Sequence, residues 1–432
     1  MNKKLILIEL NEINFDYVRE YVKSHQLPSF KKILEGNFSE TKSESNYEEL
    51  EPWIQWVSAH TGKSLTEHRV FRLGDIINSS EAQIFEKVES EGFSVGCISP
   101  MNASNNLKNP SYFIPDPWTK TKSDNSFWST RLTEVIQQVV NDNAQSKVSL
   151  KSLFFLSAGI LRYARFKNYH KYIKLALSVF KKPWAKAMFL DLFLHDVHWS
   201  LLNEKKPSFS TLFINAGAHI QHHYLFNAKV NDKKNNINNP SWYIAESEDP
   251  LLDLLKLYDS ILGEYLNCDY GLIVATGLTQ VPFTHEKYYW RIKEHSEFLN
   301  KLGITYKAVY PRMTRDFLIE FSSERDALAA EKTLADIISV TDGIKLFGEI
   351  DNRKDSLFVT LTYPHKLDDS FVVSSQNKEI DIKSDIAFVA IKNGMHSPKG
   401  FLYTDGNFPD RFENGSHVKE IYNLIDNYFK QN

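Results

Sequence analysis

A short apolar run near the start of the sequence, Leu5–Leu10, contains one charged residue, Glu9. A run that is apolar on both of its alternating faces is typical of a central strand covered by helices on each side. The carboxylate follows only four apolar residues, whereas the core of a signal peptide needs about 7–15. We therefore expect a buried first strand of an α/β domain.

Strands and helices alternate after this run. Asn14 is placed to cap a helix that continues to Val22. Further helices are predicted at 30–34, 54–60, 84–91, 251–265 and 418–429, and strands at 93–99, 211–215, 271–275, 386–391 and 400–403. This alternation predicts an α/β fold with a mostly parallel central sheet and helices on both faces.

One stretch departs from the alternation and has a β-α-β-β pattern. Strands are predicted at 316–321, 344–347 and 357–361, with a helix capped by Ser323 between the first two. We expect an inserted cap domain at 305–385 within a main domain formed by 1–304 and 386–432. The runs at 386–391 and 400–403 are expected to return to the main sheet.

The segment 143–190 is strongly basic. It contains ten Lys or Arg residues and no Asp or Glu, and apolar residues are interleaved with them. This predicts an amphipathic helix, or two helices that break between Arg165 and Tyr169. Two interpretations are open: a helix packed on the body with a solvated basic rim, or a surface that meets anionic lipid headgroups or a diphosphate-linked substrate.

Charge and cysteine content limit the partners and the compartment. The net charge of −3 and the lack of a nucleic-acid-binding motif argue against a nucleic-acid partner. Cys97 and Cys268 are isolated, which favours reduced thiols. No stretch has the roughly 18 apolar residues of a membrane span. We expect a cytoplasmic protein, with peripheral contact to the inner membrane face through 143–190 as an option.

Short motifs occur in order along the chain: Leu5–Ile8 with Leu27-Pro28-Ser29-Phe30, Trp56–Gly62 followed by His68, Thr211–Asn215 followed by His219–Tyr224, Gly271–Gly277, and Gly394–Gly400. Together they resemble the alkaline phosphatase superfamily, nearest its phosphodiesterase/nucleotide pyrophosphatase members. The resemblance implies a site at the strand ends in which two zinc-type ions flank a Ser or Thr nucleophile.

Most residues of such a site are substituted here. The positions of the family's charged ligands and nucleophile fall at Asn11, Pro52, Ala218, Thr276 and Gly277. Two histidine ligands are retained, His222 and His396. We therefore predict that no pair of zinc ions is bound and that no cofactor is firmly implied. One divalent ion on His222, His396 and a recruited carboxylate stays an option.

The resemblance also groups the candidate site residues. Glu51 or Glu9 would act as base or nucleophile, and His222 and His396 as acid/base groups. Substrate contacts are predicted for Asn11, Trp56, His68, Arg72, Asn215, Gln221, Thr276 and Gln280. The cluster His195–His198 lies outside every matched motif, so a surface helix is expected there.

Three functions remain open at this point. The first is an enzyme of altered chemistry, a hydrolase or transferase that acts on a phosphate-containing or glycan substrate, for example in surface-polysaccharide biosynthesis. The second is a non-catalytic pseudoenzyme that binds a glycan, a nucleotide or a protein partner. The third is a single-metal phosphodiesterase built on His222 and His396.

Overall fold

The computed structural model describes residues 3–141, 149–231, 237–312, 315–376, 378–406, 408 and 412–430. The chain divides into two compact units. The larger comprises Met1–Gln138, Ser149–Pro282 and Asn393–Asn432, and the smaller is formed mainly by Phe283–Lys392.

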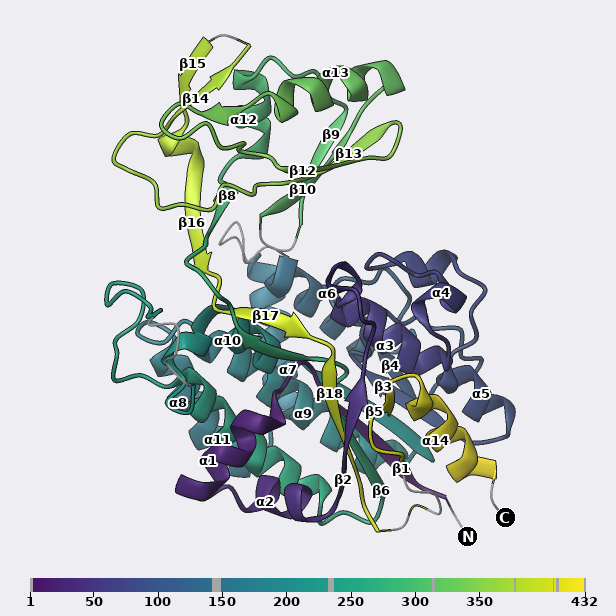
Figure 1. Cartoon of the computed structure of the whole chain (residues 1–432). Coiled ribbons are helices and arrows are strands. Elements are labelled where there is room, and N and C mark those ends of the chain that lie inside the picture. The colour runs from purple at the N-terminus through teal and green to yellow at the C-terminus, as the bar shows by residue number, and fades with distance from the viewer. Residues whose placement is uncertain are drawn as a thin grey trace. The chain divides into compact units, whose positions relative to one another are not determined.

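A mixed eight-stranded sheet forms the centre of the larger unit (Figure 1). Its strands lie in the order β19 (Ser416–His417), β2 (Asn37–Lys42), β18 (Lys399–Thr404), β6 (Gly271–Ala275), β1 (Leu5–Leu10), β5 (Phe209–Ile214), β3 (Val95–Ile98) and β4 (Tyr112–Ile114). All neighbouring pairs run parallel except those of β18, which is antiparallel to β2 and β6. The predicted α/β class and mostly parallel sheet are confirmed.

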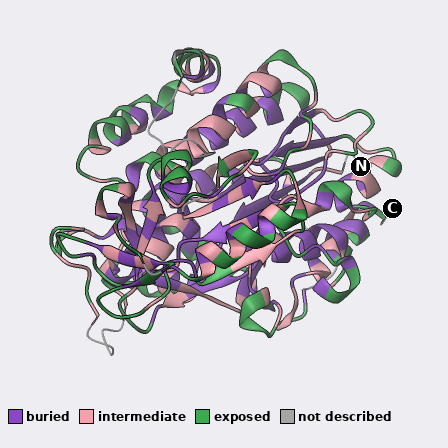
Figure 2. Ribbon diagram, turned by 90° about the horizontal axis from the view of Figure 1, so that it is seen from above, coloured by how far each residue is buried: buried purple, intermediate pink, exposed green. Residues whose placement is uncertain are grey.

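Helices cover both faces of this sheet. One layer contains α3 (Pro52–Thr61), α5 (Ile84–Ser90) and α14 (Glu420–Lys430), and the other α1 (Phe15–Ser24), α2 (Pro28–Glu35), α9 (Ala185–Lys205), α10 (Ala216–Tyr224) and α11 (Pro250–Tyr265). Leu5 and Leu7 share one face of β1 and pack in a single core with residues of the first layer. Figure 2 shows the strands buried between the helices.

Local signals explain where several of these elements begin and end. The Asn14 side chain accepts a hydrogen bond from the backbone of Asp16 at the start of α1, as predicted.

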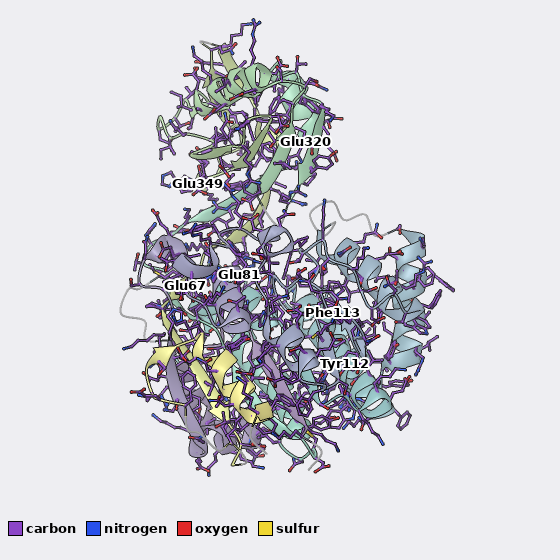
Figure 3. All side chains as sticks on the ribbon, turned by 90° about the vertical axis from the view of Figure 1, so that its right-hand side faces the viewer. Glu67, Glu81, Tyr112, Phe113, Glu320 and Glu349 are labelled. Carbon is purple, nitrogen blue, oxygen red and sulfur yellow. The ribbon has the colours of Figure 1, made fainter. Side chains whose placement is uncertain are left out.

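At the edge of the sheet, Tyr112 and Phe113 of β4 are labelled in Figure 3. Both are buried, and the Tyr112 hydroxyl lies 2.6 Å from Ser210 Oγ. This edge strand is therefore tied to the interior by its side chains.

The described part of the basic segment folds as helices, and its first residues, 143–148, lie outside the described residues. α6 (Phe127–Asn141) is followed by α7 (Leu150–Tyr163), a short 3₁₀ turn at Phe166–Asn168, and α8 (Tyr169–Ser178). The predicted break between Arg165 and Tyr169 is confirmed. The remaining elements of the larger unit are α4 (Leu65–His68), the paired strands β7 (Thr279–Pro282) and β17 (Gly394–Ser397), and 3₁₀ turns at Tyr47–Glu49, Asp75–Asn78 and Leu225–Asn227.

The smaller unit contains three antiparallel sheets. The first has the order β12 (Glu349–Asn352), β13 (Ser356–Thr360), β10 (Asp316–Glu320) and β9 (Ala308–Pro311). Glu320 and Glu349, labelled in Figure 3, belong to this sheet. The other elements are α12 (His295–Lys301), α13 (Glu324–Ala335), β11 (Ile338–Ser339), β14 (Val372–Ser375), β15 (Lys378–Asp381), a 3₁₀ turn at Lys383–Asp385, and the pair β8 (Tyr288–Ile292) and β16 (Ile386–Ile391). Ser323 caps α13 as predicted.

Two of the predicted strands in this region differ from the structure. The run 344–347 is not a strand, because its only described strand-type pairing is an isolated bridge between Lys345 and Ile338. The run 386–391 does not join the main sheet. It forms β16, which pairs with β8, and Phe388 packs against Trp290 with ring centroids 5.6 Å apart. The smaller unit therefore extends beyond 305–385 on both sides.

Within the ranges given above, no helix is long and apolar enough to cross a membrane.

Candidate metal site

Three groups from distant parts of the sequence meet beyond the ends of the central strands. Glu12 follows β1, His222 lies on α10 after β5, and His396 lies on β17. The carboxyl ends of parallel strands are where open α/β sheets bind their ligands. The three residues therefore lie where a ligand is expected.

The carboxylate of Glu12 lies between the two imidazoles. Its Oε2 atom is 3.2 Å from His222 Nε2 and 3.2 Å from His396 Nε2. The two rings are 5.1 Å apart between centroids, in an edge-to-face arrangement. Each residue offers one potential ligand atom, and these three atoms all lie within 4.8 Å of one another. Since the three donors converge, a single cation can contact all of them.

Glu12 has an uncommon backbone conformation, with φ at 62° in the left-handed region. Its N–H donates to the Thr276 carbonyl (3.1 Å), and its carbonyl accepts from Gln221 Nε2 (2.7 Å). A non-glycine residue in this region is strained by about 1–3 kcal/mol and persists where its surroundings determine it. These two hydrogen bonds hold the Glu12 side chain at the strand ends.

Two side-chain amides complete the surroundings of the carboxylate. Asn11 Nδ2 donates to Glu12 Oε1 at 3.1 Å, and Gln280 Nε2 donates to Oε2. Burial by itself raises the pKa of Glu12, but the imidazoles of His396 and His222 outweigh it and hold the pKa well below its ordinary value. Glu12 is therefore ionised and offers an anionic ligand.

The glycine that precedes the His396 motif is required by close packing. A Cβ atom on Gly394 would lie 2.0 Å from Gln280 Oε1 and 2.7 Å from the Gln221 carbonyl. β17 pairs with β7 so that His396 is directly opposite Gln280. Gly394 thus allows the strand carrying His396 to approach the two amides that surround Glu12.

Most of the predicted neutral contact residues form a buried hydrogen-bonded frame. Asn11 Oδ1 accepts from Trp56 Nε1 at 2.8 Å, and Asn11 Nδ2 donates to Asn215 Oδ1 at 2.7 Å. Trp56 is fully buried, so its ring has no exposed face for the predicted substrate contact. Thr276 is also fully buried, and its hydroxyl accepts from the Phe401 N–H at 2.9 Å, between β6 and β18.

The two carboxylates predicted as base or nucleophile lie in different places. Glu9 shares the face of β1 that packs on α3, where its Oε1 atom is 2.9 Å from His60 Nε2, and both side chains are buried. Glu51 occupies the N-cap position of α3 without a side-chain capping hydrogen bond, and its Oε2 atom lies 3.8 Å from His396 Nδ1. Of these two carboxylates, only Glu51 has a described contact with a residue of the triad, which is His396. Pro52 follows as the first residue of α3, a position that suits proline.

His68 and Arg72 lie apart from the triad in the described contacts. His68 Nδ1 accepts from the Val70 N–H at 3.0 Å, and its Nε2 lies 3.0 Å from Ser58 Oγ. Burial lowers the pKa of His68 to about 4. His68 also lines a cavity of about 410 Å³ beside Glu81, and Arg72 is exposed. The acidic residues Glu67 and Glu81 of this region are labelled in Figure 3.

Asp191 is a further buried group near the site that the motifs do not indicate. Its carboxylate accepts from the N–H groups of Asn215 (3.2 Å) and Ala216 (2.7 Å) at the start of α10, and from the Tyr258 hydroxyl (2.5 Å). Burial raises the pKa of Asp191 to about 6. Asp191 lies in α9, 24 residues before Asn215, so local sequence carries no signal for this contact.

The cluster His195–His198 does not lie on the surface, contrary to the prediction. His195, Asp196 and His198 are fully buried on α9. Asp196 accepts from the Arg165 guanidinium, and His198 lies between the Tyr265 hydroxyl and Ser210. These partners come from segments distant in sequence, and they satisfy the cluster internally.

Comparison with known proteins finds similar structures but no relatives in sequence. No protein-family model matches the chain, and no curated protein is significantly similar to it. A phosphonoacetate hydrolase from Sinorhizobium meliloti is similar in structure, with TM-score 0.45, 12% identity, and 99% of this chain and 96% of that chain covered.

Two further solved structures are similar over most of both chains. Human ectonucleotide pyrophosphatase/phosphodiesterase 5 has a TM-score of 0.43, with 11% identity and 100% and 96% of the two chains covered. Alkaline phosphatase from the Antarctic bacterium TAB5 has a TM-score of 0.38, with 9% identity and 99% and 98% covered. At such scores and identities the likeness assigns no activity to this chain.

Proposed function

We propose that this chain is an altered member of the alkaline phosphatase superfamily that holds one divalent ion on Glu12, His222 and His396. With this ion it acts on a phosphate-containing or glycan substrate as a hydrolase or transferase. The convergence of the three donors around Glu12 Oε2 is the observation that carries the proposal. The sequence motifs support the phosphate chemistry.

The donor set fits a zinc-type ion. Two imidazoles and one carboxylate are a donor set of catalytic zinc sites, which keep a further position for substrate or water. A bound ion of this kind polarises a phosphoryl oxygen. Asn11 and Gln280 hydrogen-bond the Glu12 carboxylate, as outer-shell partners of a ligating carboxylate do. They hold the oxygens of Glu12 in a defined orientation.

Glu51 has an orienting role in this arrangement. A ligating histidine commonly donates its second ring N–H to a carboxylate, which determines its tautomer. His396 turns Nε2 toward Glu12 at 3.2 Å and Nδ1 toward Glu51 at 3.8 Å, where the charge of Glu51 favours a proton on Nδ1 without a direct hydrogen bond. With the proton on Nδ1, the Nε2 lone pair of His396 is available to a cation. Glu51 thereby supports binding without itself being a ligand.

The residues present do not fit a second ion. Asn11 is hydrogen-bonded to Trp56 and Asn215, Thr276 is fully buried with its hydroxyl accepting from Phe401, and Gly277 has no side chain. Neutral groups of this kind cannot offset the cost of removing water from a divalent cation. The family's two-ion mechanism is therefore not proposed for this chain.

A non-catalytic binding protein is the second candidate, and Pro52 favours it. The resemblance places the family's nucleophile at this position, and proline has no group that attacks phosphorus. A binder would retain the ion and the phosphate-containing ligand but would not convert the ligand.

The test is a screen of phosphate esters and sugar nucleotides against the zinc-loaded protein. Turnover and equilibrium binding are measured in parallel. We expect a hit that is lost on chelation and reduced by His222→Gln, whereas His170→Gln, an exposed histidine on α8, leaves it unchanged. Turnover supports the enzyme, and binding without turnover supports the second candidate. A hit that is unaffected by chelation and by His222→Gln would contradict both.

A further inference from the structure

A concentration of exposed apolar side chains lies on α7 and α8 of the larger unit. Within the described residues, eight of the seventeen exposed large apolar side chains fall between Leu153 and Phe180. They are Leu153, Phe154, Leu161, Phe166, Tyr169, Ile173, Leu177 and Phe180. A soluble surface rarely gathers so many, and such patches mark protein or membrane contacts.

Five of these residues form one continuous line, which we name the α8 stripe: Phe166, Tyr169, Ile173, Leu177 and Phe180. Tyr169, Ile173 and Leu177 are four residues apart and lie on the same side of α8. Phe166 lies in the 3₁₀ turn before α8, and Phe180 in the turn after it. The side chain at position 180 is 92% exposed and that at 177 is 72% exposed. The stripe therefore faces away from the protein core.

The opposite side of α8 is packed in the usual way. Tyr172 and Leu175 are buried, and α8 lies against α9. The Tyr172 hydroxyl donates to Asp196 at 3.0 Å, and its ring packs on Phe189 with centroids 5.1 Å apart. α8 thus has one apolar face for the core and a second one that no described residue covers.

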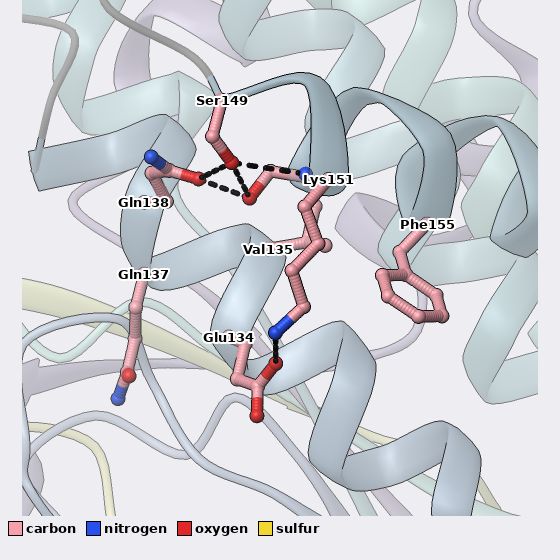
Figure 4. A pocket seen from close by; sticks show the side chains of 8 residues that line it. Glu134, Val135, Gln137, Gln138, Ser149, Lys151 and Phe155 are labelled. Atoms are coloured by element: carbon pink, nitrogen blue, oxygen red, sulfur yellow. Dashed lines mark hydrogen bonds and ion pairs between the residues drawn. The ribbon is translucent and has the colours of Figure 1, made fainter.

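Apart from Lys171, which donates to Ser260 Oγ at 2.8 Å, the described cations of this segment fall into two groups. Several are engaged by acids from other elements: Lys151 by Glu134 (3.7 Å, Figure 4), Arg162 by Glu204 (3.2 Å), Arg165 by Asp196 (2.6 Å), Lys167 by Glu264 (2.8 Å) and Lys182 by Glu248 (2.6 Å). The exposed side chains of Lys174, Lys181 and Lys186 form no ion pair with any described residue. Lys174 and Lys181 directly follow the stripe residues Ile173 and Phe180.

We propose that the α8 stripe and the three lysines Lys174, Lys181 and Lys186 form a docking surface for an anionic lipid bilayer. A helix with apolar side chains on one side and lysines beside them lies in the headgroup region with the apolar side chains inserted. The lysine stems cover apolar surface while the ammonium groups reach the phosphates. Each lysine near an anionic surface contributes about 1 kcal/mol.

Charge complementarity selects this occupant over a protein partner. The segment 143–190 contains no Asp or Glu, so every charge it presents attracts an anion. Protein interfaces are depleted in lysine, whereas membrane-surface helices are rich in it. Exposed lysines, two of which directly follow residues of the α8 stripe and one of which lies at the start of α9, are thus what an anionic lipid surface requires.

The experiment is co-sedimentation of the full chain with vesicles. We expect binding to phosphatidylcholine vesicles that contain phosphatidylglycerol and not to phosphatidylcholine alone, and weaker binding at high salt. The combined variant Ile173→Ser/Leu177→Ser/Phe180→Ser is expected to lower the affinity more than about tenfold, because each side chain loses apolar burial in the bilayer. Its melting temperature is expected to be unchanged, since these side chains are exposed.

Charge reversal tests the lysines separately. Lys174→Glu/Lys181→Glu/Lys186→Glu is expected to abolish binding to the anionic vesicles. Lys332→Glu/Lys366→Glu and Leu328→Ser, exposed positions in the smaller unit, are the matched controls and are expected to bind normally. Equal binding to neutral vesicles, equal loss in the controls, or no binding at all would overturn the proposal. The proposal would also be overturned if the chain formed a dimer that the stripe substitutions dissociate while vesicle binding persists.

Discussion

Gly394 is the first residue of β17, the strand that carries His396, and it lies against the side chain of Gln280 and the backbone of Gln221. The close approach leaves no space for a Cβ atom, and the same glutamines bond to Glu12. At the scale of single residues, the geometry of the triad thus depends on a position that has no side chain.

Gly394→Ala is predicted to destabilise the protein by about 1–3 kcal/mol, as overpacking of a well-packed interior does, and to weaken zinc binding. The reason is that the new methyl group displaces Gln280 and, with it, the orientation of Glu12. Chemical denaturation and zinc titration measure the two effects. Gly406→Ala, where a Cβ meets nothing within 4 Å, is the control and is expected to be neutral. Equal behaviour of the two variants would contradict this account.

His60→Ala is predicted to cost about 3–5 kcal/mol of unfolding free energy, because it leaves the Glu9 carboxylate buried without its partner. Zinc affinity is expected to stay unchanged, since Glu9 faces α3 and not the triad. The measurement is denaturant unfolding together with a zinc titration. Loss of zinc binding in a protein of unchanged stability would show that Glu9 belongs to the site.

α10 illustrates how one element depends on another that is distant in sequence. Its first N–H groups donate to Asp191 of α9, and its carboxyl-terminal half carries His222. A negative charge at a helix N-terminus is favourable, yet burial keeps the pKa of Asp191 raised, at about 6. At the scale of elements, the position of the metal-ligand helix is therefore linked to the protonation of a buried acid.

The Asp191 contribution to stability is predicted to fall as pH rises. Its pKa is about 6 when folded and 3.8 ordinarily, so the folded state holds the proton more tightly. The contribution is complete below pH 3.8 and is lost as pH rises through 6, by about 3 kcal/mol in total. The unfolding free energies of the wild-type protein and of Asp191→Asn are measured from pH 4 to 7. The two curves should approach each other or cross as the pH rises through this range. Parallel curves would contradict the prediction.

Across the whole molecule, the parts predicted from sequence are those governed by local pattern. Leu5–Leu10 was identifiable because both faces of a central strand are apolar, and the Ser323 cap because its partner is three residues away. The sheet that 386–391 joins was not identifiable, since its apolar residues do not specify β8 as partner. The smaller unit includes β8 and β16, which lie outside the expected range 305–385.

The residues of the candidate site likewise include some that local sequence indicates and some that it does not. His222 and His396 were found from their motifs, and the structure brings them together. Glu12 was not chosen as their shared carboxylate, because the motif points to Asn11 and the left-handed backbone at Glu12 follows from contacts with Thr276 and Gln221. A conformation imposed by residues more than 200 positions away has no local sequence signal.

Elemental analysis of the zinc-dialysed protein tests the central claim most directly. The account predicts about one ion per chain, lost in Glu12→Gln, His222→Ala and His396→Ala and retained in His68→Ala, whose histidine contacts Ser58 and Val70 instead. Melting temperature is recorded for each variant, so that loss of the ion is separated from loss of the fold. Two ions per chain that both disappear in His222→Ala, or no ion in the folded wild-type protein, would contradict the account.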